Sequence, residues 1–203
     1  MFRKTLLSAA TLAAMMSTVP AFADTTIVPD AGQGTIQFTG SVIDAPCSIV
    51  PESQNIQVNL GQVSLKSLAS ANSYSSAVPV TINLTGCSFD APTPPDTIVK
   101  YSKVSVTFPD AHTPEHGDAT QGEIANSATN PAENVVIQLL QSDGTSPVNL
   151  TKTNPTKDDD DNIQLDSTSA TSKLQFYARM MTLTAGAKAG SVGATVTYKL
   201  HYF

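Results

Sequence analysis

The 203-residue sequence has no tryptophan, only two cysteines and few charged residues. Its 11 lysine and arginine residues are outnumbered by 17 aspartate and glutamate residues, which gives a formal net charge of -6. Because nucleic-acid binding requires a basic face, we expect no nucleic-acid partner. The sequence also lacks a phosphate-binding loop, a nucleophile elbow and a zinc-protease helix motif. These absences predict a protein that is not an enzyme and holds no cofactor.

Apolar runs long enough to cross a membrane are missing as well. Near the N-terminus, Arg3 and Lys4 precede a short apolar run over residues 6–16, whereas a transmembrane helix needs about 20 apolar residues. A small-x-small motif follows and ends at Ala23. This order is typical of a secretory signal peptide, and we expect residues 1–23 to be removed by cleavage between Ala23 and Asp24. The remaining length predicts one domain.

The two cysteines, Cys47 and Cys87, both follow the predicted signal peptide. An exported chain meets an oxidising compartment, so we expect a single disulfide between them.

A metal site is not expected. His112 and His116 have the spacing of two ligands on a helix, but Pro114 disfavours a helix there and no third ligand follows at a suitable spacing. The aspartate run at residues 158–161 lacks the ligand order of a calcium-binding loop and is expected to be a solvated acidic loop.

Short runs in which apolar and polar residues alternate recur along the chain, with frequent proline and glycine between them. This pattern predicts an all-β sandwich in which each strand buries one face. The expected strands are residues 36–42, 56–60, 78–84, 104–108, 135–139, 174–180 and 194–202. We expect loops at residues 91–96, 110–131 and 154–161, and a short helical turn within residues 64–71.

The two ends of the chain have unusual features for a sandwich. Residues 24–34, rich in glycine, proline and threonine, lead into the first alternating run, and the last run is followed only by Phe203. A terminal strand without a neighbour would leave an open edge that needs covering. One explanation accounts for both ends: each molecule supplies a strand that completes the next one.

Five segments carry a resemblance to a known family. They are GTIQFTGSVIDAPC at residues 34–47, VNLGQV at residues 58–63, INLTGC at residues 82–87, FYAR at residues 176–179 and VTYKLHYF at residues 196–203. In this order, after a signal peptide, the sequence resembles the pilins of chaperone–usher fimbriae, such as type 1 and P pilus subunits.

The resemblance implies an incomplete immunoglobulin-like β-sandwich of six strands, which a donor strand from another subunit completes. It divides the chain into a signal peptide (1–23), an N-terminal donor-strand extension (24–44) and a pilin domain (45–203). It implies that the donor strand points Ile36, Phe38, Gly40 and Val42 inward, with Gly40 where no side chain fits. The C-terminal strand, with Val196, Tyr198, Leu200 and Tyr202, is expected to line the groove and meet the chaperone.

The resemblance further implies other pilin subunits, a periplasmic chaperone and an outer-membrane usher as partners, and export through the periplasm to the cell surface. The leading hypothesis is a structural subunit of a fimbria that supports adhesion. A minor adaptor or tip-associated subunit that binds a host glycan receptor is an alternative, and an unrelated periplasmic sandwich is a third. The loops at 110–131 and 154–161 look longer than a compact pilin needs, and the sequence assigns them no task.

Overall fold

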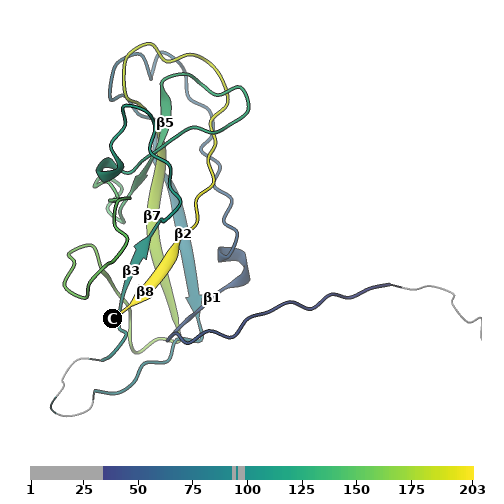
Figure 1. Ribbon diagram of the computed structural model, residues 1–203, viewed down its shortest axis with the longest axis vertical. Helices are drawn as coiled ribbons and strands as arrows, with labels where there is room; N and C mark the ends of the chain where they lie inside the picture. The colour runs from purple at the N-terminus through teal and green to yellow at the C-terminus, as the bar shows by residue number, and fades with distance from the viewer. Residues whose placement is uncertain (1–33, 93–94, 96–98) are drawn as a thin grey trace, which may run out of the picture. The chain divides into compact units, whose positions relative to one another are not determined.

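The computed structural model describes residues 34–92, 95 and 99–203 (Figure 1). The predicted signal peptide and its cleavage site at Ala23 and Asp24 lie outside the described residues. The chain forms two units, residues 1–41 and residues 42–203, and all strands belong to the second. Within the described ranges, no helix has the length and apolarity that crossing a bilayer requires.

The larger sheet is antiparallel and has five strands in the order β1-β2-β7-β5-β4. Its centre consists of β2, β7 and β5, which lie side by side in Figure 1 and pair over their whole lengths. The short strands β1 and β4 form its edges. The bounds are β1 (Ser48–Ile49), β2 (Val78–Thr85), β4 (Glu123–Ile124), β5 (Val135–Leu140) and β7 (Thr171–Thr182).

The smaller sheet has three antiparallel strands in the order β6-β3-β8, and β3 and β8 cross in front of the larger sheet in Figure 1. Its bounds are β3 (Lys103–Thr107), β6 (Ile163–Gln164) and β8 (Lys199–Tyr202). Two single 3-10 turns complete the regular structure, η1 (Pro51–Ser53) and η2 (Ala119–Gln121). The all-β sandwich expected from the sequence is confirmed.

The core lies between the two sheets and is made by alternate residues of the central strands, as period-two patterning requires. Ile82 and Phe176 from the larger sheet face Val104 from the smaller one, and all three side chains are buried. Phe108 contacts Phe176 edge to face, with ring centroids 6.0 Å apart. This apolar layer is the main source of stability, because burying such side chains contributes about 1.5–3 kcal/mol each.

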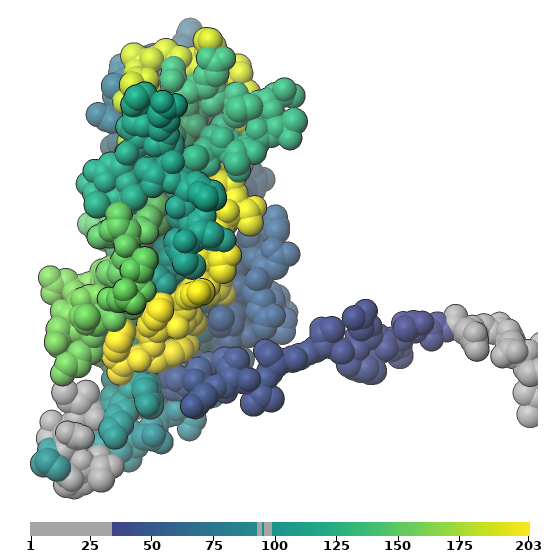
Figure 2. Space-filling model, in the orientation of Figure 1, coloured from purple at the N-terminus to yellow at the C-terminus, as the bar shows by residue number. Residues whose placement is uncertain are grey.

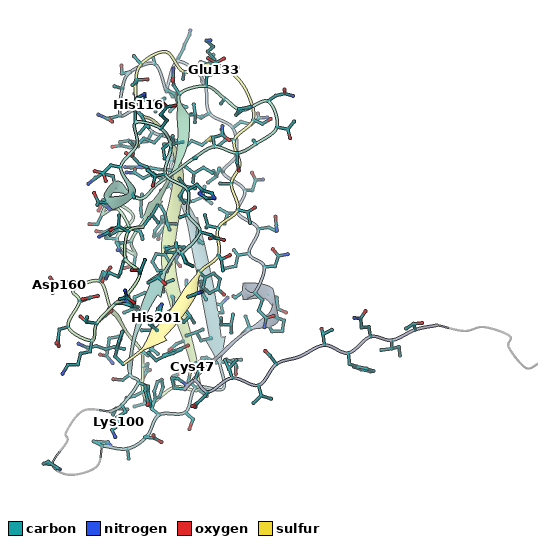
Figure 3. The ribbon with its side chains drawn as sticks, in the orientation of Figure 1. Cys47, Lys100, His116, Glu133, Asp160 and His201 are labelled. Atoms are coloured by element: carbon teal, nitrogen blue, oxygen red, sulfur yellow. A yellow bond between two sulfur atoms is a disulfide. The ribbon has the colours of Figure 1, made fainter. Side chains whose placement is uncertain are left out.

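The expected disulfide is present between Cys47 and Cys87 (Figure 3). It ties the chain just before β1 to the residues just after β2, and Cys47 is 2% exposed. The bond therefore fixes the start of the sandwich domain to its central sheet.

Four of the predicted strands are confirmed, at residues 78–84, 104–108, 135–139 and 174–180. The predictions at residues 36–42 and 56–60 are wrong, since neither segment forms a strand, and only residues 199–202 of the run at 194–202 do so. All three segments alternate correctly, but a strand also needs a partner for its backbone groups, and within the described residues the segments at 36–42, 56–60 and 194–198 lack a ladder partner.

The segment at residues 110–131 is only partly a surface loop. It contains η2 and the edge strand β4, whose Ile124 is 5% exposed and pairs with Ile137. Gly122, with φ of +71°, lets the chain before β4 lie close to the backbone of β5, since a Cβ atom at this position would lie 2.2 Å from the carbonyl oxygen of Leu139. The expected helical turn near residue 64 is present only as hydrogen-bonded turns, from Ser67 N–H to the carbonyl of Ser64 and from Leu68 N–H to that of Leu65.

Candidate functional site

The sandwich is open along one side, where a groove of about 1140 Å³ exposes part of its apolar core. Its floor is formed by inward-facing residues of the three central strands of the larger sheet. They include Val80 and Ile82 of β2, Ile137 and Leu139 of β5, and Phe176, Ala178 and Met180 of β7. A groove that uncovers core residues of a folded domain is a binding surface or an aggregation hazard.

Two extended segments border this floor. We call residues 54–65 the N-terminal bank and residues 188–198 the C-terminal bank, and all of their residues except Ser64 line the groove. In Figure 2 the yellow C-terminal bank runs along the body with blue atoms of the chain before β2 beyond it. Neither bank pairs with the other, so the groove lies where a sandwich would have a further strand.

From Ser191 onward, the backbone of the C-terminal bank has hydrogen bonds on one side only, whereas at its start the Lys188 N–H donates to the carbonyl oxygen of Glu133 (3.1 Å). Its odd-numbered residues Ser191, Gly193 and Thr197 bond the polar segment at residues 110–131 and the residues after it, with distances of 2.6–3.3 Å. The alternation continues past β8: Phe203, the residue after β8, exchanges two backbone hydrogen bonds with Lys103 of β3.

From Val192 onward, the even-numbered residues of the C-terminal bank face the other way. Among the described residues, the backbone N–H and C=O groups of Val192, Ala194, Val196 and Tyr198 have no backbone partner. Their period-two spacing makes them one continuous strand edge that borders the groove. Such an edge is a template for a further strand.

The N-terminal bank is held differently. Within the described part of the chain, no backbone–backbone hydrogen bond involves residues 55–63. At its lower end, the Tyr198 hydroxyl donates to the carbonyl oxygen of Ser53 (2.7 Å), and the Ser53 hydroxyl accepts from the N–H of Asn83 (2.9 Å). At its upper end, Leu68 is 2% exposed and packs with Val63. Between these ends Ile56 and Leu60 pack against the core, so the bank is held by side-chain packing and not by a backbone ladder.

The predicted donor residues lie in an extended segment without regular structure. Ile36, Phe38 and Val42 are 78%, 88% and 102% exposed, and a Cβ atom added at Gly40 would meet nothing within 4 Å. Alternating large apolar side chains in contact with water are unfavourable for an isolated molecule. The segment therefore has the composition of a strand and lacks the surroundings of one.

Among the predicted C-terminal residues, Val196 and Tyr198 line the groove, whereas Leu200 and Tyr202 pack against the core beyond it. The Tyr202 hydroxyl is buried and has no hydrogen-bond partner within the described residues. Burial, and next the nearby Tyr198, raise the pKa of Tyr202 to about 12. A buried hydroxyl without a partner destabilises the fold.

Two polar residues of this site, Asp110 and Asn126, were not predicted. They lie in a loop without periodicity, where no sequence pattern distinguishes one polar residue from another. Asp110 contacts the C-terminal bank at Thr197, and Asn126 contacts it at Ser191 and Gly193.

The two polar loops hold no metal-ligating cluster of three or more side chains in the ranges that the structure describes. His116 and Asp160 lie in separate loops in Figure 3. In the loop at 154–161, Lys152 pairs with Asp159 (3.1 Å) and Asp161. The lysine charge neutralises part of the acidic run, and the side chains of Asp159 and Asp161 are only partly exposed, so the run is less solvated than the sequence predicts.

Known proteins share this architecture. Residues 36–202 match the family model of fimbrial protein. The F17 fimbrial protein of Escherichia coli is 35% identical over 83% of this chain and 87% of its own length. The type 1 fimbrial subunit of Klebsiella pneumoniae is 34% identical over 98% of both chains.

Solved structures agree on the fold. A subunit from a chaperone–usher pilus, whose structure addresses rod uncoiling, has a TM-score of 0.63 at 22% identity, covering 85% of this chain and 97% of its own. The P pilus rod subunit PapA has a TM-score of 0.58 at 20% identity, covering 78% of this chain and all of its own.

Proposed function

The chain belongs to the fimbrial protein family of exported, non-enzymatic subunits of cell-surface fimbriae, and we propose that it polymerises by donor-strand exchange. In this proposal residues 24–44 of one subunit provide the strand that fills the groove of the next. Because one chain carries both a donor segment and a groove, copies can add head to tail without limit, as open heterologous assembly requires. The resulting fibre supports adhesion of the bacterium.

The observation that carries the proposal is the groove itself, with an apolar floor and an unpaired strand edge along its C-terminal bank. A strand laid beside Val192, Ala194, Val196 and Tyr198 would satisfy their backbone groups and cover the floor. Four alternate donor positions, Ile36, Phe38, Gly40 and Val42, equal these four free positions in number and spacing.

The energetics favour a durable joint. Burying Ile36, Phe38 and Val42 in the groove contributes roughly 5–9 kcal/mol before the cost of ordering the segment is subtracted. Backbone hydrogen bonds along the edge add to this and set the register, as in other cases of β-strand addition. The same interaction removes the exposed edge that would otherwise promote aggregation.

The open groove also supports a need for protection before assembly. We infer that a periplasmic chaperone covers it, with contacts to the C-terminal residues Val196, Tyr198, Leu200 and Tyr202, until an outer-membrane usher exchanges the chaperone for the next subunit. Deleting Tyr202 and Phe203 should sharply reduce chaperone capture, measured by co-purification from the periplasm.

The decisive test is the substitution Gly40→Leu. If Gly40 faces the groove floor, a leucine side chain will clash there, and we expect fibres sheared from cells to fall at least tenfold. The control is Ser41→Leu, one position along, where the side chain of an inserted strand would point out of the groove. Assembly by Gly40→Leu at the level of the control would show that the proposed donor register is wrong.

A further inference from the structure

The C-terminal bank is extended although most of it belongs to no strand. Strand β3 pairs with β8 as far as the pair Thr107 and Lys199, and the ladder then stops. Pro109 follows shortly, and a proline has no N–H to continue the pairing. Residues 188–198 therefore need another source of hydrogen bonds on the side away from the groove.

Two side chains supply these bonds where the ladder ends. The carboxylate of Asp110 accepts from the Thr197 N–H (2.6 Å) and from the Thr197 hydroxyl (2.6 Å). The amide of Asn126 donates to the carbonyl oxygens of Ser191 (2.9 Å) and Ala132 (3.3 Å) and accepts from the Gly193 N–H (3.0 Å). Each side chain takes the place of a neighbouring backbone.

The positions of these bonds determine which way the bank faces. They hold Ser191, Gly193 and Thr197, all odd-numbered, so the intervening even-numbered residues must direct their backbone groups into the groove. Backbone bonds from Ser127 N–H to Gly193 (2.8 Å) and from Ala132 N–H to Ser191 (2.8 Å) support the same orientation. Around Thr197, however, the described residues provide only Asp110.

We propose that Asp110 and Asn126 are positioning residues that hold the C-terminal bank as a preformed strand edge for the incoming strand. This inference rests on the proposed donor-strand function and gives the long polar loop at 110–131 a task. Without the two side chains, the bank would have to find its extended conformation and its register during strand uptake, which slows association.

The test measures how fast the refolded full-length chain captures a fluorescent peptide with the sequence of residues 34–44. We expect Asp110→Ala and Asn126→Ala each to slow capture about tenfold, which corresponds to the loss of about 1.4 kcal/mol. Asp110→Asn is the rescue variant, because its amide can accept from the Thr197 N–H and donate to the Thr197 hydroxyl. We expect it to remain within about twofold of the wild type.

Asp143→Ala is the matched control. Asp143 also accepts hydrogen bonds from nearby N–H and hydroxyl groups, but it does so in a turn that does not line the groove. Its removal should leave capture unchanged. If Asp110→Ala does not fold, Thr197→Val serves instead, since it loses only the hydroxyl bond and should slow capture two- to threefold.

Hydrogen exchange of the free chain provides an independent measurement. In the wild type, the amides of Gly193 and Thr197 should exchange more slowly than those of Ala194 and Val196, and Asp110→Ala should remove the protection at Thr197. Equal capture by the wild type and both alanine variants would overturn the positioning role alone. Failure of the wild type to capture the peptide would overturn the donor-strand proposal and, with it, this inference.

Discussion

The two banks of the groove are both extended and unpaired toward it, yet their backbones are held in different ways. The C-terminal bank has hydrogen bonds along its outer side, from Ser191 to Thr197, and continues into β8. The N-terminal bank has no backbone–backbone hydrogen bond at residues 55–63 within the described chain, and it is held there by the packing of Ile56 and Leu60 against the core. One bank is therefore a preformed edge, whereas the other can adjust.

This difference suggests an order of events in strand uptake. If the proposed donor strand enters this groove, it would gain backbone hydrogen bonds at once along the preformed edge, because that edge is already ordered in the fold. The N-terminal bank can then close over the bound strand. Its sequence between Asn55 and Val63 alternates correctly for this, with Ile56, Val58 and Leu60 on one face.

The largest expected effect concerns the disulfide between Cys47 and Cys87, which anchors the chain ahead of the N-terminal bank. Replacing Cys47 and Cys87 together by alanine opens a loop of 40 positions and should lower the free energy of unfolding by about 4 kcal/mol. Urea unfolding followed by circular dichroism measures this change. The wild-type chain in excess reductant should match the variant, and a loss below about 1 kcal/mol would show that the anchor is dispensable.

A glycine in each bank tests how tightly each is packed. At Gly190, a Cβ atom would lie 2.5 Å from the backbone nitrogen of Ala132, so Gly190→Ala should destabilise the chain by about 3 kcal/mol. Gly61 has open space but a φ of +73°, and Gly61→Ala should cost about 1 kcal/mol. Gly193→Ala, with only a side-chain contact at 3.7 Å, is the control and should be nearly neutral. Equal losses at Gly190 and Gly61 would contradict the difference in packing.

The sequence predicts the centre of this fold well because there the chain is its own partner. The alternating runs at residues 78–84 and 174–180 pair with each other, so their pattern and their backbone bonding agree. Residues 56–60 and 194–198 alternate just as regularly, but within the described residues they have no ladder partner, and in the proposed function that partner is a strand from another subunit. Periodicity reports which face a residue prefers and does not report whether a partner is present.

Two other features could not be predicted for different reasons. Strands β1, β4 and β6 contain two residues each, which is too short for any period to be recognised. Asp110 and Asn126 act through single side chains in a polar loop, and their importance depends on where the C-terminal bank passes in space. In contrast, the donor and C-terminal residues could be proposed because the five segments resemble one family in order.

Two tyrosines near the groove should respond with opposite signs to the same substitution. Tyr198→Phe removes the bond to the Ser53 carbonyl (2.7 Å), which ties the two banks, and should destabilise the chain by about 1 kcal/mol. Tyr202→Phe removes a buried hydroxyl without a partner in the described residues and should stabilise it by about 1 kcal/mol. Thermal or urea unfolding of both variants measures the two changes in stability, and changes of the same sign would contradict the prediction.

The smallest effect is a response to acid that only the C-terminal bank should show, because residues 54–65 contain no acidic residue or histidine. The side-chain and backbone hydrogen bonds from Thr197 hold the pKa of Asp110 below its ordinary value of 3.8. A lowered pKa means that the stabilisation is complete above pH 4 or so and is lost as the pH falls through the lowered value. Exchange of the Thr197 amide should therefore speed up in acid in the wild type beyond its intrinsic trend, and a peptide bound in the groove should dissociate faster.

Other carboxylates also titrate in this range, among them Asp159, whose pKa falls to about 2 through hydrogen bonds from Thr156 and then Lys152. Asp110→Asn separates their contribution, because it keeps the hydrogen bonds and loses only the titration: if it shows the same acid response at Thr197 as the wild type, the response does not come from Asp110.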